Sequence, residues 1–461
     1  MLSDSRLAII VGAAALAAYF NALFGSFQFD DYNVIVHNPA VHSAAAWFES
    51  MPGIRPLLKL SYTLNWIAGP APFGFHLFNV AVHAANSALV FFLFCALRDR
   101  VPASGARWAP FLGALLFALH PLHTEAVTYV SGRSVSLMAL FYLGGVLAYL
   151  RADASPAPGK LRAISAVLFA AALLTKETAV TLPLALLLCD AADPHRRPFR
   201  DMLRRQSAHW LVLIGAMVVM VASPTYRHLF EVSLSTRTVA GNLLSQIDAI
   251  WYLGGQLLMP WRLNVDPDLA VAASWTPSLA LRAALLAGAV AAGFANLRRR
   301  PWLAFALLWF FIHLLPTNSV LPRLDLANDR QLYLASVGVF LVAAIALQRL
   351  LDRAPRRWVV NALVGIMLLG LGYATAQRNE TYRSEVLFWE DAATKSPRKA
   401  RVFNNLGFVY QQAGRLDEAQ QAYLRALELD PKHPRAYWNL ENLRATSPQP
   451  SPPERAERES E

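Results

Sequence analysis

The stretch LAIIVGAAALAAYFNALFGSFQF, residues 7–29, indicates the fold class, because it carries no charged side chain over 23 residues. A helix of about 20 apolar residues is long enough to cross the ~30 Å hydrocarbon core of a bilayer. The stretch has no convincing cleavage site and exceeds the apolar core of a typical signal peptide. We therefore predict that it is a membrane anchor.

Composition extends this prediction to the whole chain. Of the 461 residues, 55% are hydrophobic and 16% are charged, and the mean hydropathy is +0.33. These values are typical of a polytopic membrane protein, and they exclude the three soluble domains that the length alone would suggest. The two cysteines, Cys95 and Cys189, are too few for a disulfide framework or a cysteine-rich zinc site. Further apolar stretches lie within residues 60–97, 108–119, 134–150, 163–175, 178–189, 206–226, 283–297, 301–322, 331–348 and 358–377.

Basic residues orient the predicted helices. The net charge is +11, and the basic residues gather in short loops, which membrane topology explains better than nucleic acid binding. Arg outnumbers Lys by 36 to 6, which is typical of a GC-rich, bacterial genome. Placing the basic loops in the cytoplasm predicts about eleven transmembrane helices in a bacterial inner membrane, with a cytoplasmic N-terminus and an external C-terminus. These loops lie at residues 98–107, 151–162, 196–205, 298–300 and 349–357.

This topology makes residues 1–378 an all-α, polytopic membrane domain. Its larger outer loops are residues 26–75 and 227–281. We expect residues 239–261, within the second loop, to form a re-entrant or interfacial helix. A further span there would move the arginines at 298–300 to the outside.

Residues 379–446 carry a repeat instead of membrane spans. Pro397 and Pro431 are 34 residues apart, and so are Asn405 and Asn439. A helix–turn–helix period of 34 residues is that of the tetratricopeptide repeat, and about one full unit is present. Such units do not bury their faces alone, so we expect this segment to contact the membrane domain or a protein partner. The tail, residues 447–461, has four prolines and is predicted to be disordered.

The first polar motif on the predicted outer side is FDDYNVIVHNP, residues 29–39. Asp30 and Asp31 are adjacent carboxylates whose repulsion can raise the pKa of one of them. Such a carboxylate could accept the proton of a hydroxyl nucleophile. Helix capping in a solvated turn is the alternative interpretation of the acidic pair.

The second motif, HPLHTEAVTYVSGR, spans residues 120–133. His120, His123 and Glu125 resemble a metal-binding set. Because Pro121 disfavours the regular helix that would align these side chains, a divalent metal is not favoured. The preferred interpretation is a polar re-entrant turn, with Arg133 available to an anion.

Two further motifs carry cations. In TKE, residues 175–177, Lys176 could bind a phosphate, or it could form an interfacial ion pair with Glu177. In NDRQLYLASVG, residues 328–338, Arg330 could clamp a phosphate, and helix capping is the alternative role of this motif.

A polar stripe accompanies these motifs within residues 60–97. Its members step by three, four and three residues, so they share one helix face. We expect that face to look into the bundle and to make hydrogen bonds between helices. The stripe consists of His76, Asn79, His83 and Asn86.

Taken in order, these motifs resemble the transmembrane and tetratricopeptide-repeat O-mannosyltransferases, which belong to the GT-C glycosyltransferases. RPLLKLSYTLNW (55–66) and HLFNVAVHAAN (76–86) add to a resemblance that runs over nearly the whole chain. It implies a GT-C helical bundle and an inverting transfer of a sugar, mannose in the best-known members, from a polyprenyl phosphate carrier to a hydroxyl. No metal is required, because a lipid phosphate is already a good leaving group.

The resemblance also assigns residues. Asp30 or Asp31 matches the acidic motif and is implied to be the general base, and basic residues are implied to neutralise the departing phosphate. Asp329 stands where the eukaryotic members usually have Glu, and Thr175 where they usually have Ser. The implied phosphate ligands are Arg55, Arg133, Lys176 and Arg330, and the other implied pocket residues are His120, His123, Glu125, Glu177 and Tyr333.

We expect the acceptor to be Ser or Thr of an exported protein that the repeat segment docks. Transfer to a lipid or a surface polysaccharide is an alternative with the same chemistry. The other class of function is non-catalytic: a transporter of lipid-linked sugars, or a scaffold that recruits a partner through the repeats.

Overall fold

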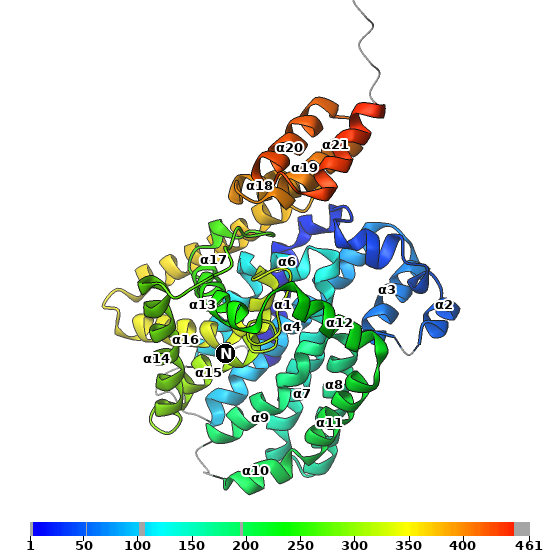
Figure 1. Cartoon of the computed structure of the whole chain (residues 1–461). Coiled ribbons are helices and arrows are strands. Elements are labelled where there is room, and N and C mark those ends of the chain that lie inside the picture. The colour runs from blue at the N-terminus through cyan, green and yellow to red at the C-terminus, as the bar shows by residue number, and fades with distance from the viewer. Residues whose placement is uncertain (1–2, 52, 101–106, 194–196, 447–461) are drawn as a thin grey trace, which may run out of the picture. The chain divides into compact units, whose positions relative to one another are not determined.

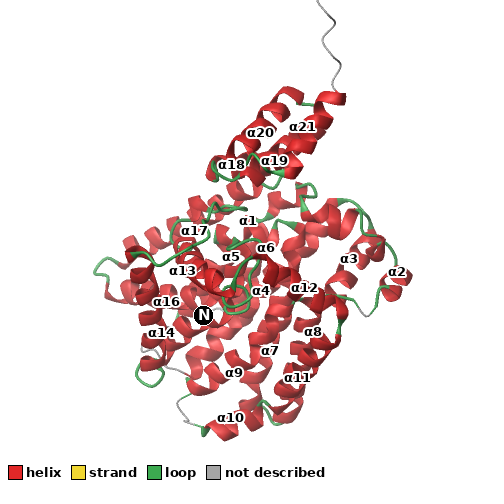
Figure 2. Cartoon of the chain, viewed as in Figure 1, coloured by secondary structure: helices red, strands yellow, loops and turns green. Residues whose placement is uncertain are grey.

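The computed structural model describes residues 3–51, 53–100, 107–193 and 197–446, so the predicted disordered tail, residues 447–461, lies outside the described residues. Within the described part every regular element is a helix, as Figure 2 shows, and the predicted all-α class is therefore confirmed. The chain divides into two units. The larger comprises Met1–Val265 and Leu269–Ser384, and the smaller comprises Asp266–Asp268 and Glu385–Glu461.

The larger unit is a polytopic membrane bundle. Among the described residues, six helices are long and apolar enough to cross a membrane (Figure 1). A pair bent by 67°, α10 (Phe199–Arg205) with α11 (Ser207–Ala222), would provide a seventh span. The predicted number of about eleven spans stays a prediction. The six helices are α4 (Pro72–Arg100), α7 (Arg133–Arg151), α8 (Pro158–Thr175), α14 (Pro277–Asn296), α16 (Leu332–Arg353) and α17 (Arg357–Glu380).

The N-terminal helix is shorter than the apolar stretch that predicted it. Helix α1 (Asp4–Ala18) has 15 residues, and a 3-10 turn follows at Phe20–Phe24. The side-chain amide of Asn379 donates hydrogen bonds to the Ala18 carbonyl oxygen (3.1 Å) and to Asn21 Oδ1 (2.9 Å). Residue 379 thus fixes the point where α1 ends. At 1.5 Å per residue, α1 is about 22 Å long, which is less than the ~30 Å hydrocarbon core.

Short apolar helices fill the interior of the bundle. Helix α5 (Ala109–Leu119) has nine buried residues out of 11. Helix α15 (Pro301–Leu314) packs closely on α16, because a Cβ atom at Gly338 would lie only 2.4 Å from the Ala306 carbonyl oxygen. Helix α13 (Val239–Gln256) is not among the six candidate spans, and its re-entrant placement stays a prediction. The unit also contains α2 (Ala44–Glu49), α3 (Pro56–Ala68), α6 (Thr124–Val127), α9 (Leu182–Ala191) and α12 (Pro224–Thr236).

The smaller unit is a helical repeat segment. Gly414, in the left-handed region at φ 74°, lies in the turn between its second and third helices. Asp266 belongs to this unit, where the Lys399 ammonium group and the Arg401 guanidinium bind its carboxylate at 2.5 Å each. Apart from Asp266–Asp268, this unit begins at Glu385. The four helices are α18 (Glu385–Lys395), α19 (Ala400–Gln412), α20 (Leu416–Leu429) and α21 (Pro434–Thr446).

Candidate active site

Asp31 joins the first two polar motifs. Its carboxylate is fully buried and accepts hydrogen bonds from the backbone N–H groups of Gln28 (2.9 Å) and Ser131 (2.8 Å), and also from the Ser131 hydroxyl. Burial raises the pKa of Asp31 to about 7, although these hydrogen bonds oppose the shift. Both oxygens of Asp31 are thus occupied by protein donors.

Asp30 has a different environment. It is only half-buried, and its carboxylate makes no hydrogen bond or ion pair among the described residues. Its backbone N–H donates to the Tyr129 hydroxyl at 2.9 Å. The preceding residue, Phe29, has φ 34°, a strained value for a residue with a side chain. Strain of this kind costs about 1–3 kcal/mol and gathers at functional sites.

Glu125, which is buried, and Arg330, which is half-buried, form an ion pair that joins the second and fourth motifs. The Arg330 backbone N–H donates to one oxygen of Glu125 (2.9 Å), and the Arg330 Nε lies 3.3 Å from the other. Burial raises the pKa of Glu125, and the charge of Arg330 opposes this shift. The Arg330 guanidinium also lies 5.9 Å from the centre of the Tyr129 ring. Tyr129 therefore contacts both Asp30 and Arg330.

A pocket lined by cations lies beside this ion pair. Lys176, Arg323 and Arg330 line a space of about 440 Å³. Burial lowers the pKa of Lys176 well below its usual value, and the charges of Arg330, Arg55 and Arg323 lower it further. Within the described residues, neither Lys176 nor Arg323 pairs with a carboxylate. The pocket, which we call the cation pocket, is also lined by Val135, Met138, Thr178, His313, Thr317, Asn328, Gln331 and Leu334.

Two side-chain amides of the cation pocket lack protein partners. The side-chain oxygen and nitrogen of Asn328 and of Gln331 are buried and make no hydrogen bond in the part of the chain that the structure describes. Leaving a buried polar group unsatisfied costs about 1–3 kcal/mol. A cation-rich pocket with such amides is suited to a polar, anionic ligand.

Arg55 and Glu177 form a second ion pair near Lys176. The Arg55 Nε and the Glu177 Oε1 are 3.0 Å apart, and a second contact at 2.8 Å makes the pair bidentate. The Tyr226 hydroxyl donates to the same carboxylate at 3.1 Å. Burial raises the pKa of Glu177, but Arg55 holds it below its usual value. Arg55 has φ 53° and is, with Phe29, one of the non-glycine residues with positive φ in the described chain.

Arg133 does not face the cation pocket. It is fully buried, and its guanidinium donates to Asn79 Oδ1 (2.7 Å) and to the carbonyl oxygens of Ser61 (3.1 Å) and Phe75 (3.0 Å). The guanidinium also lies 4.4 Å from the ring centre of Phe78. Because these partners occupy its donors, Arg133 holds α3 and α4 together and leaves the set of phosphate ligands that we predicted.

His120, His123 and Tyr333 also lie outside the cation pocket. His120 accepts the backbone N–H of Leu122 (3.1 Å), as a helix cap does, and His123 contacts Ser336 Oγ (3.0 Å). The Tyr333 hydroxyl contacts His83 Nδ1 at 2.8 Å. The three side chains are thus held by protein partners in the bundle interior. The described residues contain no group of three or more His, Cys, Asp or Glu residues that could hold a metal ion.

The predicted polar stripe of α4 is confirmed to face the interior. All four side chains are fully buried. Asn79 Nδ2 donates to the carbonyl oxygens of Val127 (3.1 Å) and Val130 (3.2 Å), and Asn86 Nδ2 donates to that of Ser136 (2.8 Å). The stripe therefore supports the turn that carries Glu125 and Tyr129.

Comparison with known proteins gives relatives over nearly the whole chain. Human protein O-mannosyl-transferase TMTC3 is 25% identical over 94% of this chain and 52% of its own length. Protein O-mannosyl-transferase F38B6.6 of Caenorhabditis elegans is also 25% identical, over 93% of this chain and 63% of its own length. Both of these relatives are named protein O-mannosyl-transferases. The resemblance inferred from the motifs is therefore confirmed.

Two further matches cover only parts of the chain. Drosophila melanogaster protein O-mannosyl-transferase Tmtc2 is 34% identical over 45% of this chain and 23% of its own length. The tetratricopeptide repeat family matches residues 400–433, which confirms the predicted repeat. The chain spans about half the length of the human mannosyl-transferase that it matches.

Sequence reasoning missed several residues of the site. Tyr129 and Ser131 lie within the second motif, close to Glu125 in the sequence. This proximity was the signal that could have identified them as residues of the site. Arg323 lies five residues before Asn328, outside any quoted motif, and Tyr226 lies in an amphipathic helix. Nothing in their local sequence distinguishes Arg323 and Tyr226 from residues outside the site.

Proposed function

We propose that this protein is a membrane glycosyltransferase that transfers a sugar from a polyprenyl phosphate carrier to a hydroxyl group of a protein. Mannose is the sugar that the names of its relatives suggest. The observation that carries the proposal is the contact of Tyr129 with both Asp30 and Arg330. Through it, Asp30, whose carboxylate has no ion-pair partner among the described residues, is linked by one side chain to Arg330 of the cation pocket.

The proposed reaction is an inverting displacement at the anomeric carbon. The acceptor oxygen forms a bond to C1 of the sugar while the bond between C1 and the phosphate oxygen breaks. The electron pair of the broken bond leaves with the phosphate. Asp30 takes the hydroxyl proton, which is general base catalysis worth typically 10²–10⁴-fold in rate. Asp31 holds the turn, because its oxygens are already occupied by Gln28 and Ser131.

The cation pocket is proposed to bind the phosphate of the carrier. Lys176 and Arg323 have no carboxylate partner in the described residues, so a phosphate would relieve their mutual repulsion. Guanidinium and ammonium groups placed where negative charge develops stabilise a transition state. This role needs no metal, and the ion pairs of Arg55 and Arg330 would position the neighbouring loops.

Sidedness and acceptor are part of the same proposal. We place the site on the outer face of a bacterial inner membrane, with Ser or Thr of exported proteins as acceptor. The repeat segment would dock that protein, since tetratricopeptide repeats present binding surfaces.

Substitution of Asp30 tests the proposal in purified protein with polyprenyl phosphate mannose and a Ser/Thr peptide. We expect Asp30→Asn to lower turnover at least about 100-fold, because the proton acceptor is lost, while binding of the donor persists. Asp201→Asn, at an exposed position of α10, is the control and should keep full turnover. Wild-type turnover of Asp30→Asn would refute the base assignment. Donor binding without turnover in the wild type, with peptide, lipid and polysaccharide acceptors alike, would favour a transporter.

A further inference from the structure

Two cavities adjoin each other at the far end of α4. This end lies about 28 Å from Asn79, counting 19 residues at 1.5 Å each. Arg98 and Pro110 line both cavities. One cavity is apolar and the other is polar, and neither belongs to the candidate active site.

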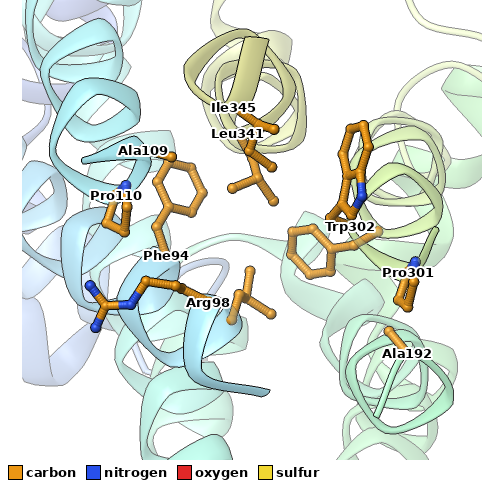
Figure 3. A pocket seen from close by; sticks show the side chains of 11 residues that line it. Phe94, Arg98, Ala109, Pro110, Ala192, Pro301, Trp302, Leu341 and Ile345 are labelled. Atoms are coloured by element: carbon orange, nitrogen blue, oxygen red, sulfur yellow. The ribbon is translucent and has the colours of Figure 1, made fainter. Parts of the chain in front are cut away.

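The apolar cavity has about 450 Å³ of empty space, part of it open to the surroundings, between α4, α5, α15, α16 and the residue that follows α9. Figure 3 shows Phe94, Leu341 and Trp302 around it, whereas the Arg98 guanidinium points away from these side chains, toward the side of Pro110. Only the aliphatic part of Arg98 therefore contributes to the lining, as is usual for an arginine at the edge of apolar surface. The remaining residues that line the apolar cavity are Leu97, Ala109, Ala192, Pro301, Phe305 and Ile345.

The polar cavity lies where the Arg98 guanidinium points. It has about 420 Å³ of empty space, part of it open to solvent, and is lined by Asp4, Arg98 and Arg107 together with aromatic residues, of which Trp108 lies under the Arg107 guanidinium at 5.6 Å. Two guanidinium groups and one carboxylate thus share this cavity. Arg98 also contacts the exposed carboxylate of Asp99 at 2.9 Å. Surface ion pairs of this kind contribute little, so a phosphate could share Arg98 with Asp99.

We propose that these two cavities bind one phospholipid whose headgroup carries a phosphate and a primary amine. One acyl chain fills the apolar cavity. The phosphate lies between Arg98 and Arg107, and the ammonium group pairs with Asp4. The charges of the polar cavity match such a zwitterion, and basic pockets between transmembrane helices are known to hold lipid headgroups.

This lipid is distinct from the sugar donor. Trp309 is fully buried, and its Nε1 donates to the Leu334 carbonyl oxygen at 2.7 Å. On α15, Trp309 lies between Phe305 of the apolar cavity and His313 of the cation pocket, and its ring packs against both side chains at 4.9 and 4.3 Å. Trp309 therefore lies between the two ligand sites along α15, and the proposal does not depend on the proposed enzymatic function.

Photo-crosslinking of the full-length protein in nanodiscs tests the proposal. The probes are phosphatidylethanolamine, phosphatidylcholine and phosphatidylglycerol that carry the same diazirine-bearing acyl chain. We expect phosphatidylethanolamine to label Trp302, Phe305 or Ile345 at least threefold more than the other two lipids, as mapped by mass spectrometry. Equal labelling by the three lipids would overturn the headgroup assignment and the site with it.

Substitutions in each cavity test the contributions of the acyl chain and of the headgroup to binding separately. Ala192→Phe should fill the apolar cavity and remove most of the labelling, whereas Leu369→Phe, at an exposed position of α17, should not change it. Arg98→Gln with Arg107→Gln removes the proposed phosphate ligands and should lower labelling by all three lipids, whereas Asp4→Asn should abolish only the preference for phosphatidylethanolamine, even if Ala192→Phe fails to fold. Labelling of the same residues by a polyprenyl phosphate probe in preference to phosphatidylethanolamine would assign the cavity to the donor and refute the proposal.

Discussion

At the scale of single residues, Asp30 and Asp31 are neighbours in the chain with opposite environments. The strained φ of Phe29 precedes the pair, and the turn that follows buries Asp31 under Gln28 and Ser131. Asp30 stays half-buried and without a partner for its carboxylate in the described chain. A buried carboxylate saturated by donors suits a structural role, and an available one suits proton transfer.

The pKa of Asp31 leads to a prediction about stability and pH. The folded-state value of about 7 is above the usual 3.8, so the folded protein holds this proton more tightly than the unfolded chain. The corresponding stabilisation is complete below about pH 4 and is lost as the pH rises to about 7. We expect the thermal midpoint to be higher at pH 5 than at pH 8. Asp31→Asn should flatten this difference and cost about 1–3 kcal/mol at pH 5, because one acceptor is lost.

The measurement is thermal unfolding in detergent across this pH range. Asp201→Asn, whose carboxylate is exposed, should keep the pH dependence of the wild type. A pH profile that Asp31→Asn leaves unchanged would contradict the burial of a protonated carboxyl group at this position.

Lys176 gives a prediction in which stability and ligand binding change in opposite directions. Its ammonium group is buried, contacts Ser134 Oγ at 3.3 Å and is repelled by Arg323 and Arg330. Lys176→Met should therefore leave the ligand-free protein as stable or more stable, because a buried charge is costly. Affinity for polyprenyl phosphate should fall about tenfold or more, since a charge-assisted contact is removed.

Thermal unfolding and equilibrium binding of the carrier lipid measure the two effects. Lys160→Met, at an exposed position of α8, is the matched control and should alter neither quantity. Unchanged affinity in Lys176→Met would remove Lys176 from the phosphate site.

At the scale of elements, the turn between α6 and α7 positions the site. A Cβ atom at Gly132 would lie 2.2 Å from the Glu125 carbonyl oxygen and 2.9 Å from the Ala126 Cα. Only glycine allows the chain to fold back so closely, and this fold places Ser131 on Asp31 and Glu125 beside Arg330. The turn between α6 and α7 therefore contacts both the first motif, through Asp31, and the fourth motif, through Arg330.

Gly132→Ala should consequently disrupt the turn. We expect a loss of at least about 1–3 kcal/mol in stability, because the backbone must move away from an overpacked position. Gly365→Ala in α17 meets no atom within 4 Å, so it should be neutral or slightly stabilising through helix propensity. Thermal unfolding of the two variants side by side measures the difference. Equal midpoints for the two variants would contradict the tight contact at residue 132.

At the scale of the larger unit, the site residues gather at one end of the bundle. Thr128 Oγ1 donates to Asn379 Oδ1 at 2.7 Å, so the C-terminal end of α17 lies at the site. The basic residues that precede α17 lie at its other end. The positive-inside rule then predicts an external site.

Reporter fusions test this orientation. Fusions after Arg353 and after Glu380 lie at the two ends of α17, and we expect a cytoplasmic and an external signal, respectively. The physical reason is the retention of Arg349, Arg353, Arg356 and Arg357 on the cytoplasmic side. An external signal after Arg353 would invert the whole topology and move the site to the cytoplasm.

The sequence by itself determined the helices and the motifs, because apolar periodicity, 34-residue spacing and polar residues within apolar stretches are local properties. It could not determine which cations remain available. Arg133 belongs to a motif, but Asn79, Ser61 and Phe75 occupy its guanidinium, whereas Arg323 belongs to no motif and lines the cation pocket. Whether a buried side chain is satisfied depends on partners that are distant along the chain and close in space, so only the tertiary structure decided it.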